Sequence, residues 1–104
     1  MRRAGRTDQN HEEVVAALRK MGCSVQSLAG LGNGVPDLLV GSLGLPWPHM
    51  VLMEVKDGTK PQSRRRLTPH QLEWRQAWKG EIWTVTSVAD VTAQLIWWCG
   101  RRTG

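Results

Sequence analysis

The sequence predicts a single α/β domain in which helices flank a mixed β-sheet. Three observations lead to this prediction. The 104 residues suffice for one hydrophobic core but not for two. Segments with the apolar spacing of helices alternate with short β-type segments, in the order helix, three strands, helix, strand, helix. No repeat or linker divides the chain, so residues 1–104 are assigned to one domain.

The first helix is expected to begin at residues 8–10, where short polar side chains precede apolar residues at helical spacing. Gly22 should end it. Residues 23–28 alternate in polarity as a strand does, and the glycine-rich segment 30–34 predicts a turn. Because proline and a strand follow these glycines, rather than the start of a helix, a nucleotide-binding loop is excluded.

Two apolar runs, residues 36–41 and 50–56, predict the strands of a hairpin. Residues 42–49 join them and contain two prolines, which suit a loop. The polar and basic segment 57–67 is expected to form an exposed loop. Each run nevertheless carries charged residues where a buried strand should have none, and this requires an explanation.

The second half of the chain begins with a clear helix signal. Thr68 can cap the helix, Pro69 fits its first position, and Gln71 lies three residues after the cap. Residues 81–86 predict a short strand. Residues 87–90 read as another capping box, which should start a last helix with its valine and leucine side chains facing inward.

Charge and composition favour a nucleic-acid partner. The 14 Lys and Arg residues outnumber the 9 Asp and Glu residues, which leaves a net charge of +5. No apolar run approaches the ~20 residues of a membrane span, and the start lacks an apolar signal region, so a cytoplasmic protein is expected. The 2 cysteines and 3 histidines lack zinc-site spacing, and the cysteines are expected to be reduced.

The charged residues in the two hairpin strands can meet at one place. Pairing Gly41 with Met50 puts Asp37 opposite Glu54, and Lys56 lies on the same strand face as Glu54. Cross-strand Cβ atoms are about 4.5–5.5 Å apart, and two carboxylates that close repel each other unless a cation lies between them. Mg²⁺ or Mn²⁺ suits such oxygen ligands, and a nearby lysine can orient water or stabilise charge on a phosphate.

These residues occur in a recognisable order. Pro36-Asp37 and Glu54-Val55-Lys56 resemble the PD-(D/E)XK nuclease motif. Together with Glu13 and residues 67–71, they are similar to the successive motifs of the VRR-NUC nuclease family. The resemblance implies a restriction-endonuclease-like fold. It also implies a Mg²⁺- or Mn²⁺-dependent deoxyribonuclease that hydrolyses phosphodiester bonds.

The resemblance also implies roles for individual residues. The metal would be surrounded by the acids Glu13, Asp37 and Glu54, with the main-chain carbonyl of Val55 as a further ligand. The catalytic set would be Glu13, Asp37, Glu54, Lys56 and Gln71, with Gln71 supporting Lys56. Compact members of the family, many of them phage-encoded, form homodimers that act on branched DNA such as four-way (Holliday) junctions. Larger members carry additional domains, so this chain is expected to be of the compact type.

Two of these residues have an alternative structural role. Glu13 could complete a capping box with Asn10, although its helical phase flanks the apolar stripe while Glu12 faces solvent. Gln71 forms a possible capping box with Thr68, and this role is compatible with a role at the site.

The basic loop is expected to bind DNA through phosphates rather than bases. The residues assigned to this contact are Lys60, Arg64, Arg65 and Arg66. A solvated loop without a partner is the alternative. For the whole chain, the alternatives to a junction resolvase are a non-catalytic nucleic-acid-binding module of the same fold and a nuclease that cuts flaps or duplex DNA.

Overall fold

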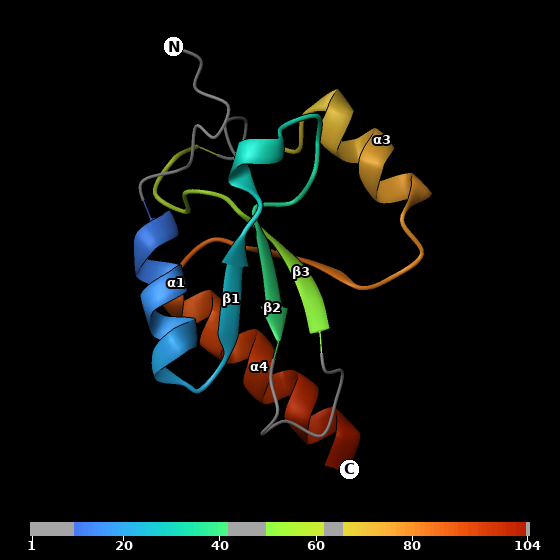
Figure 1. Ribbon diagram of the computed structural model, residues 1–104. Helices are drawn as coiled ribbons and strands as arrows, with labels where there is room; N and C mark the ends of the chain where they lie inside the picture. The colour runs from blue at the N-terminus through green and yellow to red at the C-terminus, as the bar shows by residue number, and fades with distance from the viewer. Residues whose placement is uncertain (1–9, 42–49, 62–65, 104) are drawn as a thin grey trace.

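The computed structural model describes residues 10–41, 50–61 and 66–103, with side chains as far as residue 96. The elements in chain order are α1 (His11–Lys20), β1 (Ser24–Ser27), η1 (Ala29–Leu31), β2 (Leu38–Gly41), β3 (Met50–Val55), α3 (Pro69–Ala77), β4 (Ile82–Val85) and α4 (Val88–Thr103) (Figure 1). This order is the predicted one, with a short 3-10 helix added in the glycine-rich segment. Within the described ranges, no helix is both long and apolar enough to cross a bilayer.

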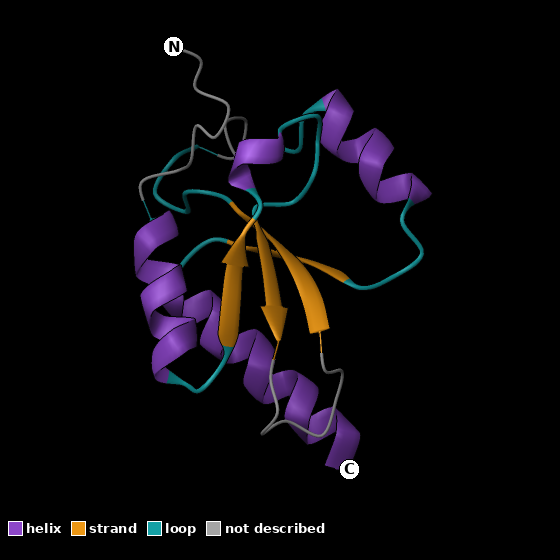
Figure 2. Ribbon diagram, viewed as in Figure 1, coloured by secondary structure: helices purple, strands orange, loops and turns teal. Residues whose placement is uncertain are grey.

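The strands form one mixed sheet in the order β1-β2-β3-β4 (Figure 2). Strands β1, β2 and β3 are antiparallel neighbours, whereas β4 runs parallel to β3. The parallel pair requires a crossover, and the segment containing α3 supplies it. The predicted α/β fold, a restriction-endonuclease-like mixed sheet flanked by helices, is therefore confirmed.

The register between β2 and β3 is the one predicted from the sequence. Gly41 pairs with Met50, and Leu38 pairs with Met53. Asp37 precedes Leu38 by one residue and Glu54 follows Met53 by one, so the two acids are level with each other. The loop 42–49 that joins these strands lies outside the described residues.

The hydrophobic core lies between one face of the sheet and the helices α1 and α4, which Figure 1 shows on the same side of it. Met53 and Val55 point to this face, as alternation along a strand requires. The helices contribute Leu18 and Val91, which are fully buried. Each fully buried side chain of this size stabilises the fold by about 1.5–3 kcal/mol.

The opposite face of the sheet is only partly covered, by α3. Leu39 and Leu52 line an apolar groove of about 530 Å³ there, together with Trp74 of α3 and Trp78, which follows the helix. The two indole rings stack with centroids 4.9 Å apart, and Trp78 remains 46% exposed. Because α3 has no buried residue, its position depends more on specific polar contacts than on core packing.

The capping-box alternative requires the Asn10 side chain to cap α1, but that side chain makes no capping hydrogen bond. Its Nδ2 donates hydrogen bonds to the carbonyl oxygens of Lys56 at 3.1 Å and Thr86 at 2.8 Å. The capping box with Glu13 is therefore wrong, because the Asn10 amide connects the start of α1 to the ends of β3 and β4 instead.

Two further local expectations are corrected. Asp57, placed in the exposed basic loop, is buried, and its Oδ1 accepts hydrogen bonds from the N–H and hydroxyl of Thr59. These bonds lower its pKa. The capping box of the last helix is only half formed. Ser87 Oγ accepts from Asp90 N, but the Asp90 carboxylate accepts from the N–H and hydroxyl of Thr86 rather than from Ser87.

Candidate active site

Asp37 and Glu54 meet where the antiparallel ladder of β2 and β3 ends. Asp37 Oδ2 accepts a hydrogen bond from the N–H of Val55 at 2.8 Å, so a side chain continues the ladder where the main chain of β2 no longer does. The Glu54 side chain next to it is only 3% exposed. A carboxyl that is almost completely buried beside a second one is the charge arrangement expected from the hairpin register.

The surroundings of Glu54 favour its protonated form. Its pKa is raised from 4.5 to about 8, mainly by burial and then by the charge of Asp37 and a hydrogen bond with that side chain. The positive charges of Lys56 and Arg75 act in the opposite direction. Ionisation of both carboxyl groups is therefore unfavourable, and a cation between them would reduce the repulsion between the two negative charges.

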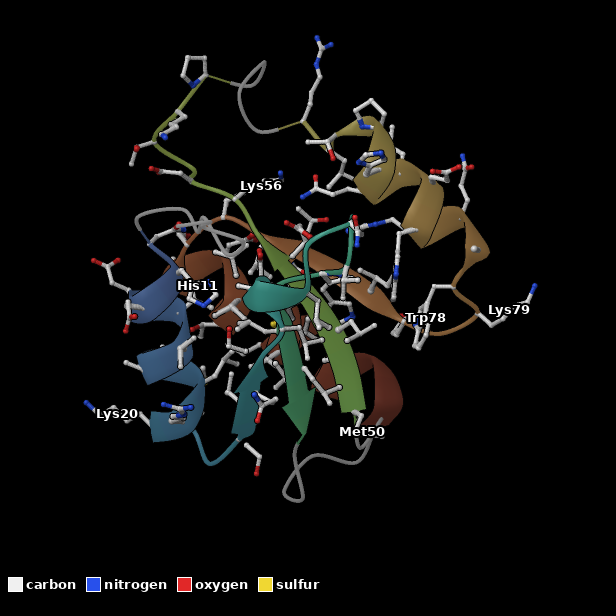
Figure 3. All side chains as sticks on the ribbon, turned by 45° about the horizontal axis from the view of Figure 1, so that its top comes forward. His11, Lys20, Met50, Lys56, Trp78 and Lys79 are labelled. Carbon is white, nitrogen blue, oxygen red and sulfur yellow. The ribbon has the colours of Figure 1, made fainter. Side chains whose placement is uncertain are left out.

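Gln71 connects the acid pair to Lys56. Lys56 Nζ donates to Gln71 Oε1 at 3.0 Å, and Gln71 Nε2 donates to Glu54 Oε2 at 3.0 Å. Gln71 also forms the predicted capping box with Thr68, whose N–H donates to Oε1 at 2.9 Å. Both roles expected of Gln71 are present together. Figure 3 shows Lys56 at this end of β3, with Met50 at the opposite end.

The main chain of Lys56 is held from two sides. Its N–H donates to the Val85 carbonyl at 2.9 Å, and its carbonyl accepts from Asn10 Nδ2 at 3.1 Å. Asn10 also binds the Thr86 carbonyl, which ties the ends of the parallel strands β3 and β4 together. The sequence does not reveal this role, because Asn10 at the start of a helix has the appearance of an ordinary cap.

Arg75 is a second residue whose place near the site was not predicted from the sequence. Its Nη2 donates to Thr84 Oγ1 at 3.0 Å, and Thr84 is the partner of Glu54 in the β3–β4 pair. The signal that could have found it is its spacing. Arg75 follows Gln71 by four residues, so both side chains project from one face of α3.

A comparison with solved structures finds one described as "VRR_NUC domain". It has a TM-score of 0.56 and 29% sequence identity, and the match covers 85% of this chain and 90% of that chain. The chain therefore resembles a VRR-NUC domain in its fold. No family model matches the sequence, and no curated protein matches it. The resemblance predicted from the motifs is confirmed, membership of the PD-(D/E)XK superfamily is consistent with it, and the likeness supports a nuclease domain.

Not every predicted site residue of this chain lies at the acid pair. Glu13 is exposed on α1, and the described residues include no group of three or more His, Cys, Asp or Glu that could hold a metal ion. The role of Glu13 at the site stays a prediction. Lys60 and Arg66 are exposed on either side of the basic loop, whereas Arg64 and Arg65 lie outside the described residues.

The acid pair fits a divalent cation that the protein holds with few side chains. Mg²⁺ is commonly bound through one or two carboxylates, with water and substrate phosphates completing its ligands. Asp37 and Glu54 provide such a pair, and the raised pKa of Glu54 shows how poorly the site tolerates both charges without a cation. The carbonyl of Val55 as a further ligand stays a prediction.

Proposed function

We propose that this VRR-NUC domain is a DNA endonuclease that hydrolyses phosphodiester bonds with Mg²⁺ or Mn²⁺ held by Asp37 and Glu54. One observation supports the proposal most directly: a single amide, that of Gln71, joins the Lys56 ammonium to the Glu54 carboxylate beside Asp37. A structural ion pair would not need a third residue between its charges. A site that has to keep a lysine available while orienting a carboxylate does need one.

The side chains divide the chemistry among them. A divalent cation would polarise the phosphate and make water a stronger nucleophile at neutral pH. Lys56 orients the attacking water or stabilises the negative charge that develops on the phosphate oxygens. Gln71 keeps Lys56 in place by accepting one hydrogen bond from its ammonium group. The other ammonium hydrogens remain available for substrate or water. Glu13 assists the metal or the water when DNA is bound.

The proposal is tested by cleavage of labelled DNA with Mn²⁺ or with a chelator. Wild-type protein should cut only with the metal ion, and Lys56→Ala should lower the cleavage rate by at least ~100-fold because it removes charge stabilisation at the phosphate. Its affinity for DNA in chelator should stay close to that of the wild type. Lys79→Ala, an exposed lysine just after the far end of α3, is the matched control (Figure 3).

Wild-type-like cleavage by Lys56→Ala would remove this residue from the mechanism. Absence of any metal-dependent cutting by the wild type, with DNA binding retained, would identify the chain as a non-catalytic binding module of the same fold.

We further propose that the substrate is branched DNA, in particular a four-way junction, and that the active form is a homodimer with two sites. The similarity to compact VRR-NUC proteins supports this proposal, as does the net charge of +5, which favours a polyanion. Duplex, flap and four-way junction substrates should be compared under one condition, with light scattering for the oligomeric state. Paired symmetric nicks in the junction are expected. Preferential cutting of flap or linear duplex, or a monomer, would contradict this proposal.

A further inference from the structure

Arg75 is a cation beside the acid pair that the proposed mechanism does not use. We infer that Arg75 binds a phosphate group of the DNA, at or next to the bond that is cleaved, and so forms part of the substrate-binding surface. This inference deepens the proposed nuclease function and rests on it. It is drawn from the position of the guanidinium group, its unused donors and its exposure.

The position of Arg75 follows from the way α3 faces the sheet. Gln71 and Arg75 are one helical turn apart and project from the same face. Gln71 reaches Glu54 on β3, and Arg75 reaches Thr84 on β4. Glu54 and Thr84 are direct partners in the parallel pair, so their side chains emerge on the same face of the sheet. Arg75 is therefore held at the edge of the acid pair.

The guanidinium group still has most of its capacity to bind. It carries five N–H donors, and within the described residues only the bond from Nη2 to Thr84 Oγ1, at 3.0 Å, is formed. The positive charge of Arg75 also acts on the nearby carboxyl of Glu54. The side chain is partly exposed, so its remaining donors can reach a ligand from solvent. The bond to Thr84 orients the plane of the group and lowers the entropy lost when a ligand binds.

A phosphodiester group is the ligand whose chemistry matches. The planar fork of an arginine can bind two phosphate oxygens with parallel N–H bonds, which a lysine cannot do. The Lys56 ammonium, held through Gln71, provides a second cation on this side of the sheet. Gln71, which holds the Lys56 ammonium, and Arg75 are one helical turn apart on α3, ~5.4 Å along its axis, so both cations are positioned by the same helix face.

The inference is tested by the salt dependence of DNA binding in chelator, where no cleavage occurs. The affinity for a labelled four-way junction is measured by fluorescence anisotropy between about 50 and 200 mM salt. Arg75→Ala should reduce the slope of log K against log salt by about 0.9, the value for one phosphate contact. Arg75→Lys should keep the slope but bind more weakly than the wild type, because a point charge replaces the fork.

Lys20→Ala is the matched control, because it also removes one positive charge. Lys20 is exposed in the last turn of α1 and points away from Lys56 in Figure 3, so its slope should equal that of the wild type. Circular dichroism checks that each variant is folded, and Arg75→Gln replaces Arg75→Ala if the latter does not fold.

A wild-type slope in Arg75→Ala, or an equal loss in Lys20→Ala, would overturn the inference. Wild-type protein that fails to bind DNA would instead contradict the proposed function itself, so the two failures are distinguishable.

Discussion

Glu54 shows at the scale of a single residue how the fold prepares a site. Its carboxyl is almost completely buried next to Asp37, and its Oε2 accepts a hydrogen bond from the amide of Gln71. Burial disfavours the ionised form, and the neighbouring carboxyl disfavours it further. At neutral pH the carboxyl therefore keeps its proton, which a divalent cation would displace on binding.

This arrangement predicts how stability depends on pH. The folded-state pKa of about 8 lies above the ordinary value of 4.5, so the folded protein retains a proton that the unfolded chain has lost. The contribution of Glu54 is fully present below about pH 4.5 and is lost as the pH rises towards 8. The free energy of unfolding, measured with urea in chelator, should fall across this window by up to ~1.4 kcal/mol per pH unit.

Glu54→Gln should flatten that decline, because the amide does not titrate. Glu12→Gln, which changes an exposed acid of α1, is the control and should keep the wild-type pH dependence. If Glu54→Gln and the wild type have parallel curves, the carboxyl does not titrate in this window. Added Mn²⁺ should stabilise the wild type more as the pH rises, since the cation competes with the proton.

At the scale of an element, the helix α3 is positioned by a few hydrogen bonds and one close backbone contact rather than by a buried apolar face. Gln71 and Arg75 reach β3 and β4 from it. Gly34, with φ of +84°, lies so close to the main chain of His70 that an added Cβ would collide with the His70 carbonyl. The glycine therefore sets how closely the loop before β2 approaches the first turn of α3, which carries Gln71.

Gly34→Ala should consequently displace the start of α3 and destabilise the protein. The left-handed backbone and the collision both oppose the new side chain, so a loss above ~1 kcal/mol in the free energy of unfolding is expected. The cleavage rate should fall as well, because the Gln71 bonds to Lys56 and Glu54 depend on the position of this helix. Gly30→Ala is the control, since its Cβ meets nothing within 4 Å. Equal stability of the two variants would contradict this account.

At the scale of the whole molecule, the positive charge of the chain and the path of the basic loop indicate where a polyanion would bind relative to the acid pair. The net charge is +5, and the basic loop leaves the end of β3 directly after Lys56 and returns to α3 just before Gln71. Both ends of the loop are therefore tied to the acid pair. A polyanion bound along this loop would pass the site, whichever of the loop residues contact it.

Changing Arg64, Arg65 and Arg66 together to Ala should therefore weaken DNA binding without loss of the fold. Each lost phosphate contact lowers the slope of log K against log salt by about 0.9, so a reduction of roughly 2–3 is expected. Anisotropy titrations in chelator measure the slope, and thermal unfolding serves as the control for stability. An unchanged slope would exclude this loop from the binding surface.

Much of this protein could be predicted from local patterns. Apolar periodicity and capping residues predicted the order of elements, and the hairpin register predicted that Asp37 lies level with Glu54. The Thr68 box was predictable because its partners are three residues apart. The helix and its cap depend on spacing within one element, and the register depends on strand alternation once the hairpin pairing is assumed.

The tertiary structure alone decided the rest. Asn10 reaches carbonyls 46 and 76 residues away, and Arg75 reaches Thr84 because β4 lies parallel to β3 beside Glu54. A capping residue and an arginine on a polar helix have many satisfactory partners in an isolated segment. Their partners are selected only when packing places helices and strands against each other, and that choice depends on the sum of many contacts rather than on any local spacing.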